Sequence, residues 1–223
     1  MEKRKREMKL NIPMCAACIL LCLTLITTHM TGGLYAKYTA SGAGSDSARV
    51  AKFNEITISE TGDFGKNGDV KALILPGVNL RKKAVVNFPA SEVGAYVFVE
   101  YSLPDKWLAV DTNSDSKPDK FAVKSDTAEL MSWSPASSWS YLTSTKSGGQ
   151  TTYVFYRRLA PGIGLNNDDL IKNSEITVSE DISKNQLAEM TGIYIDLRAT
   201  VVQAGDFDSA DTAWVSIVGK GGH

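Results

Sequence analysis

Strict alternation of apolar and polar residues near the C-terminus is the feature that most constrains the fold. In 193–201, apolar side chains occupy every second position, and Asp196, Arg198 and Thr200 fall between them. Successive side chains of an extended strand point to opposite faces, so this pattern predicts a strand with one face in the core and the other towards solvent. A chain that contains such a strand must supply further strands to pair with it.

Other short runs rich in β-branched and aromatic residues predict those partners. They are 56–59, 72–75, 84–88, 95–101, 107–110, 121–123, 152–156 and 175–179. Pro76-Gly77 and Pro161-Gly162 predict turns, because proline fixes φ and glycine permits positive φ. Short helices are predicted over 183–190 and from Ser209 towards Trp214. We therefore expect a mainly β protein, an antiparallel jelly-roll or immunoglobulin-like β-sandwich with one or two short helices.

The first 36 residues carry the order basic, apolar, small that is typical of a secretory signal peptide. Five basic residues lie in 1–9, and a mostly apolar run follows over 14–26. That run is shorter than the roughly 20 residues that span a bilayer. We expect a helical signal peptide, 1–36, which a signal peptidase cleaves between Ala36 and Lys37. A lipoprotein modified at Cys18 and an uncleaved anchor are the two alternatives.

The cysteines and the charge set limits on the remaining 187 residues. Cys15, Cys18 and Cys22 all lie in the predicted signal, so the mature chain would contain no disulfide and no thiolate metal ligand. Five of the 24 basic and two of the 25 acidic residues are removed with it, which leaves a formal charge of −4. Nucleic acid is not an expected partner, because it requires clustered cations. The run Arg81–Lys83 is interpreted as the solvated start of a strand.

Several segments resemble the TasA/camelysin family of secreted Gram-positive biofilm-matrix proteins. These segments are 32–36, 45–53, 75–77, 199–207 and 213–214. The resemblance implies a jelly-roll sandwich that is secreted to the extracellular matrix or cell surface after cleavage by a dedicated signal peptidase. It also implies fibres, built as a head-to-tail homopolymer together with other matrix components, in which the N-terminal segment of one subunit completes the sheet of the next. The membrane would be a partner of the precursor only.

The candidate donor segment is 37–50, between the predicted signal and a sandwich domain over 51–218 that ends in a tail, 219–223. Its candidate donor residues are Tyr38, Thr39, Ala40, Ser41, Ala48 and Val50. A sandwich with an open edge exposes unpaired backbone groups, which an extended peptide from a neighbour can satisfy by strand addition. Such a head-to-tail contact does not close on itself, so it propagates into a filament. The alternative is a disordered tail, which the glycine and serine content favours.

An enzymatic function is not expected, although some members of the resembling family carry a metallopeptidase label. After the predicted cleavage the remaining histidine is His223, and the chain contains no His-Glu-x-x-His. Zinc sites and nucleophilic triads both draw on histidine or cysteine. The pair Asp168-Asp169 is interpreted as solvated loop charge. A secreted metallopeptidase therefore remains the least favoured alternative.

A second candidate site is an oxygen-rich run over 111–119. Its oxygen ligands match positions 1, 3, 5, 7 and 9 of a calcium loop, from Asp111, Asn113, Asp115, the Lys117 carbonyl and Asp119. Ser116 replaces the usual glycine and Ala122 the usual bidentate carboxylate, so any Ca²⁺ binding should be weak, about 10⁻⁴ to 10⁻³ M. The alternative is an Asx-rich turn between two strands. No other cofactor is expected.

Three aromatic residues leave open a binding function on the same sandwich. Trp133, Trp139 and Tyr141 lie among serines. Exposed, they would form a stacking platform for sugars and favour a monomeric cell-surface adhesin, the main alternative to a fibre subunit. Aromatic residues in such strands more commonly pack into the core.

Overall fold

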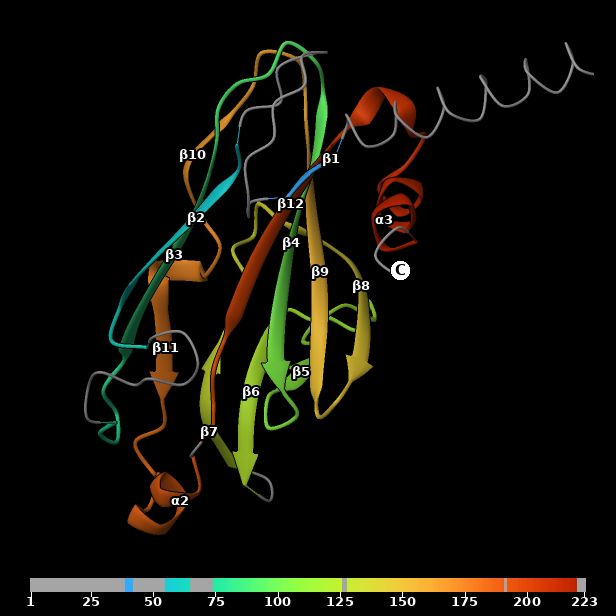
Figure 1. Cartoon of the computed structure of the whole chain (residues 1–223). Coiled ribbons are helices and arrows are strands. Elements are labelled where there is room, and N and C mark those ends of the chain that lie inside the picture. The colour runs from blue at the N-terminus through green and yellow to red at the C-terminus, as the bar shows by residue number, and fades with distance from the viewer. Residues whose placement is uncertain (1–38, 42–54, 65–73, 126–127, 191, 220–223) are drawn as a thin grey trace, which may run out of the picture. The chain divides into compact units, whose positions relative to one another are not determined.

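The computed structural model describes residues 39–41, 55–64, 74–125, 128–190 and 192–219, which form two antiparallel sheets with their inner faces packed together (Figure 1). The chain divides into two units between Tyr38 and Thr39, and every described residue lies in the second unit, Thr39–His223. The predicted signal peptide with its cleavage site Ala36–Lys37 lies outside the described residues. The predicted mainly β, antiparallel sandwich with two short helices is confirmed.

The five-stranded sheet has the order β1-β12-β4-β9-β8, and its neighbours are antiparallel. Its strands are β1 (Thr39–Ser41), β12 (Asp196–Gln203), β4 (Ala95–Pro104), β9 (Gln150–Leu159) and β8 (Ser140–Ser147). The central strand β4 is buried along most of its length, which suits its β-branched and aromatic sequence.

The seven-stranded sheet has the order β10-β3-β11-β7-β6-β5, and β2 pairs with the other side of β3. Its strands are β2 (Thr57–Gly62), β3 (Leu80–Phe88), β10 (Leu165–Asp169), β11 (Glu175–Val178), β7 (Ala128–Trp133), β6 (Lys120–Ser125) and β5 (Leu108–Val110). Because β10 pairs with the end of β3 and β11 with its beginning, β2 is an edge strand of this sheet.

Connections between the sheets define the two ends of the sandwich. At the end that is uppermost in Figure 1, here called the upper end, the chain crosses from β3 to β4 and from β9 to β10. At the lower end it crosses from β4 to β5, and from β11 through α2 (Lys184–Glu189) to β12. Helix α2 begins with a capping box, since the Ser183 hydroxyl accepts from the Gln186 N–H and the Gln186 side chain accepts in return.

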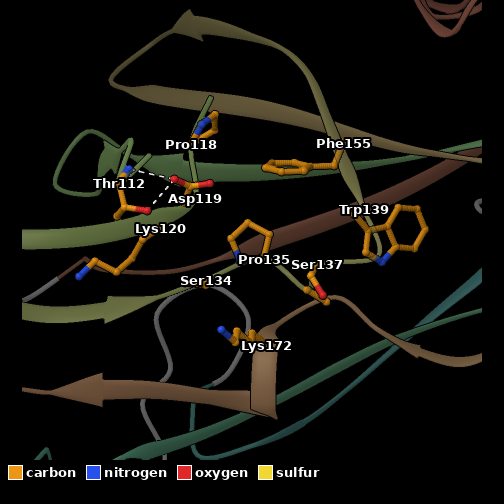
Figure 2. A pocket seen from close by; sticks show the side chains of 11 residues that line it. Thr112, Pro118, Asp119, Lys120, Ser134, Pro135, Ser137, Trp139, Phe155 and Lys172 are labelled. Carbon is orange, nitrogen blue, oxygen red and sulfur yellow. Dashed lines mark hydrogen bonds between the residues drawn. The ribbon is translucent and has the colours of Figure 1, made fainter. Parts of the chain in front are cut away.

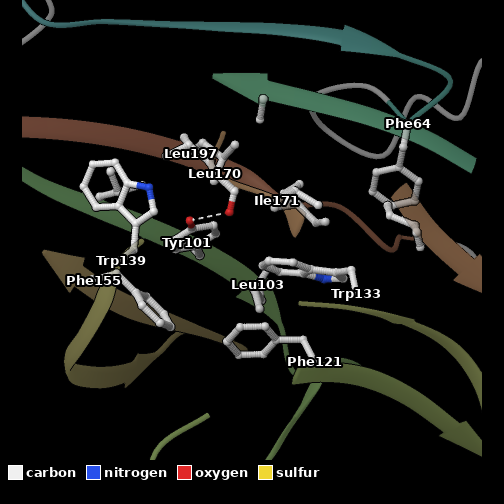
Figure 3. Packing of buried hydrophobic residues seen from close by; sticks show 14 of the residues in the cluster. Phe64, Tyr101, Leu103, Phe121, Trp133, Trp139, Phe155, Leu170, Ile171 and Leu197 are labelled. Atoms are coloured by element: carbon white, nitrogen blue, oxygen red, sulfur yellow. Dashed lines mark hydrogen bonds between the residues drawn. The ribbon is translucent and has the colours of Figure 1, made fainter. Parts of the chain in front are cut away.

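The main core lies between the sheets and is rich in aromatic rings (Figure 3). The Phe121 and Trp133 rings stack with centroids 4.7 Å apart, and Tyr101 lies 5.5 Å from Trp133. The Tyr101 side chain is fully buried, and its hydroxyl donates to the Leu170 carbonyl at 2.9 Å. Burial raises the pKa of that phenol far above its ordinary value, so the group stays a neutral donor.

A second apolar cluster covers the outer face of the five-stranded sheet. Helix α3 (Ala210–Val218) begins at the predicted cap Ser209 and packs against β4, where the Trp214 and Phe98 rings lie 5.2 Å apart. Val202 and Ala204 belong to the same cluster. The outward face of β12 is therefore partly apolar, which explains why Thr200, in register with Phe98, is buried.

The structure corrects the sequence-based prediction in several places. The strand predicted over 193–201 runs from Asp196 to Gln203, although Ile193 and Ile195 are buried as expected. In the predicted strand 72–75, Ile74 and Leu75 are not in a strand, and residues 72–73 lie outside the described residues. Strands β7, β8 and β10 were not among the predicted strands. Two 3₁₀ turns, Lys172–Ser174 and Ala204–Asp206, complete the fold.

Candidate assembly edge

The edge of β12 is the place where the N-terminal segment meets the sandwich. Strand β1 pairs with β12 in antiparallel register, with Thr39 opposite Val202, Ala40 opposite Val201 and Ser41 opposite Thr200. On its other side β12 pairs with β4 over its full length. Among the described residues, no strand pairs with 196–199 on the β1 side. That half of the edge leaves its backbone groups available for an added strand.

Only part of the predicted donor segment can be placed. Thr39, Ala40 and Ser41 form β1, whereas Lys37, Tyr38, Ala48 and Val50 lie outside the described residues. Three inward residues of β12 are apolar: Leu197, Ala199 and Val201 belong to the main core. An added strand on this edge would therefore extend an apolar sandwich face.

Three other edges of the described sheets carry features that discourage strand addition. Strand β8 has a register shift between Tyr141 and Thr143, and its exposed Lys146 pairs with Asp105 at 2.9 Å. Strand β5 has three residues. Bulges, lysines and short length are established ways in which proteins protect an edge. Strand β12 pairs with β4 through eight residues without a register shift, and its two charged residues, Asp196 and Arg198, are exposed on the face away from the core.

The third protected edge, β2, carries an inward charge. Glu60 shares its face with Ile58, which packs against the main core, and its carboxylate contacts the Lys82 Nζ at 2.5 Å. Lys82 lies on the core-facing side of β3 and is fully buried, while the Glu60 side chain is 11% exposed. An inward-pointing charge on an edge strand needs a partner inside the sandwich. If another strand paired with β2 and shifted its register, the Glu60–Lys82 pair would break, so this pair protects the edge.

The buried lysine corrects the interpretation of Arg81–Lys83 as a solvated run. Arg81 and Lys83 are exposed, but Lys82 between them is not. Strand parity alone would have found it, since Lys82 lies two residues from both Leu80 and Ala84. Three consecutive cations suggest a solvated run, although the middle one points to the opposite face of the strand from its two neighbours.

The electrostatics of the β12 face centre on Glu100. Its carboxylate lies 3.9 Å from the Arg198 Nε, across the β4–β12 pair. Burial raises the pKa of Glu100, Arg198 lowers it and nearby Asp196 raises it again, with burial the largest contribution, so the net shift is upward. The outward face beside the edge thus holds an anion whose charge is poorly compensated.

The predicted calcium loop is ordered by its own hydrogen bonds. The Asp111 carboxylate accepts the backbone N–H groups of Asn113, Ser114, Asp115 and Ser116 at 2.6–3.3 Å. The Asp119 carboxylate accepts from the Thr112 hydroxyl at 2.7 Å and from its N–H at 2.9 Å, which lowers the pKa of Asp119. Ser116 takes a φ of 64°, the left-handed conformation for which calcium loops use glycine.

The same loop does not present a preassembled metal site. Within the described ranges, no group of three or more His, Cys, Asp and Glu side chains is arranged to hold a metal ion. The Asp111 and Asp119 oxygens face N–H and O–H donors, which a cation would repel. The Asx-rich turn therefore accounts for the geometry of 111–119, and weak Ca²⁺ binding stays a prediction from the sequence.

A cavity of about 440 Å³ lies next to this loop (Figure 2). Asp119, Lys120, Ser137 and Lys172 line it, with the edge of Trp139 on one side. Trp139 is 5% exposed and donates its indole N–H to the Asp169 carbonyl at 3.1 Å; Trp133 is 3% exposed. Both tryptophans are core residues, as the more common packing role predicts, and they do not form an exposed platform for sugars.

Comparisons with known proteins returned no matching family model, no matching curated protein and no matching solved structure. The similarity to the TasA/camelysin family therefore rests on the quoted sequence segments alone. In the part of the chain that the structure describes, no helix has the length and apolar character needed to cross a membrane.

Proposed function

We propose that this chain is a secreted structural subunit of extracellular biofilm-matrix fibres that assembles by donor-strand exchange. The observation that carries the proposal is the pairing of β1 with β12, an edge that is eight residues long, has no register shift and carries no inward-pointing charge. The segment predicted from the sequence as the donor includes the three residues that occupy this edge. Secretion and the matrix location rest on the predicted signal peptide and the family resemblance.

The physical argument is that pairing within one chain and pairing between two chains use the same contacts. A strand that adds to the edge of its own sheet can add equally well to the edge of an identical subunit, as in domain swapping. Intermolecular pairing satisfies the same backbone groups, and the open half at 196–199 offers room for a longer donor. Because donor and acceptor lie on different parts of the surface, the exchange propagates instead of closing.

The test is electron microscopy of the purified chain that begins at Lys37, beside the same chain without residues 37–50. Both apolar clusters lie within residues 56–217, so the shortened chain retains them and should give the same circular dichroism spectrum. We expect filaments only from the longer chain. A chain that keeps residues 37–50 but ends at Gly219 is the matched control and should still form filaments.

A peptide of residues 37–50 provides a second, independent measurement. Added in excess before assembly, it should occupy the β12 edge and suppress filaments, whereas a peptide of scrambled sequence should not. Filaments from the variant without residues 37–50 would support the fibre function but show that this segment is not the donor. Monodisperse particles from every form, alone or mixed, would contradict a self-assembling subunit.

The monomeric adhesin has less support than the fibre subunit. Its predicted platform is buried at Trp133 and Trp139, which leaves the polar cavity beside Lys120 and Lys172 as the place to look. Glycan binding by isolated monomers would favour it. A casein-cleavage assay with and without chelator tests the metallopeptidase alternative.

A further inference from the structure

The direction of β1 gives a fibre of the proposed kind a defined polarity. Along β12 the chain runs from Thr39, beside Val202, to Ser41, beside Thr200, and so from the upper end of the accepting sandwich towards its lower end. The next described strand, β2, begins at the upper end of its own sandwich, because Thr57 pairs with Asn87 near the end of β3. In a fibre, the chain of the donor subunit would therefore run off the acceptor subunit at the acceptor's lower end. It would then enter the donor's own sandwich at the donor's upper end.

The connecting chain is long enough for this arrangement. Fifteen residues separate Ser41 from Thr57 and reach at most about 50 Å when fully extended. Ser41 pairs with Thr200, and the four residues 196–199 of β12 lie between Thr200 and the lower end of the acceptor, a distance of roughly 13 Å. The upper end of the donor can therefore face the lower end of the acceptor directly.

Each of these two ends presents a rigid apolar turn. At the lower end Leu75-Pro76-Gly77-Val78 is closed by a hydrogen bond from the Val78 N–H to the Leu75 carbonyl at 3.2 Å. Gly77 has a φ of 73°, as the third position of a type II turn requires, and its N–H donates to the Ser179 carbonyl at 3.1 Å. The side chains of Leu75 and Val78 are 46% and 47% exposed.

The turn at the upper end is built in the same way. In Ala160-Pro161-Gly162-Ile163 the Ile163 N–H donates to the Ala160 carbonyl at 3.1 Å, and Gly162 has a φ of 78°. The Gly162 N–H donates to the Ser91 carbonyl at 2.7 Å, which holds the turn on the neighbouring loop. Ile163 is 52% exposed. Both turns are therefore fixed to the sandwich while their apolar side chains face solvent.

We infer that the Leu75–Val78 turn of one copy packs against Ile163 of the next copy in the fibre. This inference rests on the proposed function, because only that function brings the two ends together. In a single copy the turns cannot touch: β3, which spans about 26 Å, runs from beside one turn to beside the other. The contact is between different surfaces of identical subunits, so it propagates in the same direction as the donated strand.

The contact fixes orientation and adds to the affinity of the donated strand. Three half-exposed side chains are too few for an independent interface, which needs about 1,000 Å² of buried surface. Their burial reduces the concentration of subunits needed for assembly, and we expect Ile163→Ser to raise this critical concentration about tenfold. Leu108→Ser, on the lateral edge strand β5 where Leu108 is 47% exposed, is the matched control and should leave it unchanged.

Cysteine cross-linking tests the contact directly, because the chain that begins at Lys37 has no cysteine. Filaments of the double variant Val78→Cys/Ile163→Cys, oxidised or treated with a short bis-maleimide, should give a ladder of covalent oligomers on a denaturing gel. Neither single variant should cross-link alone, and a mixture of the two should stop at dimers. Leu108→Cys/Val215→Cys, at two lateral positions, should give no ladder.

The outcomes separate the two proposals. Filaments that form normally but give no ladder, together with an unchanged critical concentration for Ile163→Ser, overturn the end-to-end contact and leave the fibre function standing. Cross-linking of either single variant would show a symmetric contact and also overturn it. A chain that forms no filaments under any condition overturns the fibre function, and the contact with it.

Discussion

Removing the buried cation at Lys82 should destabilise the sandwich far more than removing its exposed neighbour. Lys82→Met replaces a fully buried ammonium with an apolar side chain of similar length and removes the Nζ that the Glu60 carboxylate, 11% exposed, contacts at 2.5 Å. Breaking one side of a buried pair costs about 3–5 kcal/mol. The residual exposure of Glu60 puts our expectation at the lower value, about 3 kcal/mol.

The assay is urea and thermal unfolding at pH 7. For a domain of this size each kcal/mol shifts the melting temperature by about 2–4 °C, so Lys82→Met should lower it by roughly 6–12 °C. Lys83→Met is the control, because Lys83 is exposed on the opposite face of the same strand, and it should change stability by less than about 0.5 kcal/mol. Equal effects for the two variants would refute the argument from burial.

The double variant Glu60→Leu/Lys82→Met separates stability from edge protection. Replacing both partners of a buried pair with apolar residues is often neutral or stabilising by about 1–4 kcal/mol. The double variant should therefore recover the stability that Lys82→Met loses. Without the inward charge the β2 edge is open to strand addition, so we also expect lateral association that native subunits do not show. A double variant as unstable as the single one would show that the loss came from packing and not from the broken ion pair.

Three further predictions concern the outer face, the Asx-rich loop and one turn. Glu100→Gln should stabilise the protein at neutral pH. Because the pKa of Glu100 is raised in the native state, the native state holds this proton to a higher pH than the unfolded state does, and the stability of the native protein falls as pH rises through the raised pKa. The stability advantage of the variant should therefore vanish below the ordinary carboxyl pKa range. An unchanged pH profile of unfolding would contradict this. Calorimetry at millimolar calcium measures Ca²⁺ binding by residues 111–119. The absence of a heat of binding would contradict the weak Ca²⁺ binding predicted from the sequence. Gly62→Ala should lower the free energy of unfolding by at least about 1–3 kcal/mol, since Gly62 has a φ of 123° and a Cβ there would lie 2.2 Å from the Arg81 carbonyl oxygen. Gly148→Ala, with open space around the added Cβ, should lower it by less.

Local patterns in the sequence predict those elements whose cause is local. The alternation over 193–201 predicts β12, because side chains of a strand alternate whatever the strand pairs with. Ser209 predicts the start of α3 through a capping bond that spans three residues, and the structure shows the same local bond at Ser183, at the start of α2. Pro76-Gly77 and Pro161-Gly162 predict turns for the same reason, since each is defined by four consecutive residues.

Where the environment decides, the sequence led to a wrong interpretation at Lys82 and left alternatives open at the Asx-rich loop and at the tryptophans. Lys82 is buried because Glu60, 22 residues away, meets it inside the sandwich. The oxygens of Asp111 and Asp119 bind their own loop, although their spacing matches a calcium loop equally well. The serine-rich sequence around Trp133 and Trp139 is compatible with exposed or buried side chains. The facing sheet determines that both are core residues.

The sequence by itself determined the fold class, the turns and the helix cap at Ser209, and it predicted residues 37–50 as a candidate donor strand. Only the tertiary structure decided which edge receives that segment and which edges are protected. The reason is that periodicity is a property of neighbours along the chain, whereas pairing joins distant segments: β12 lies between residues 39–41 and residues 95–102. An edge is open or closed according to what lies beside it in space, and that is decided when the sheets assemble.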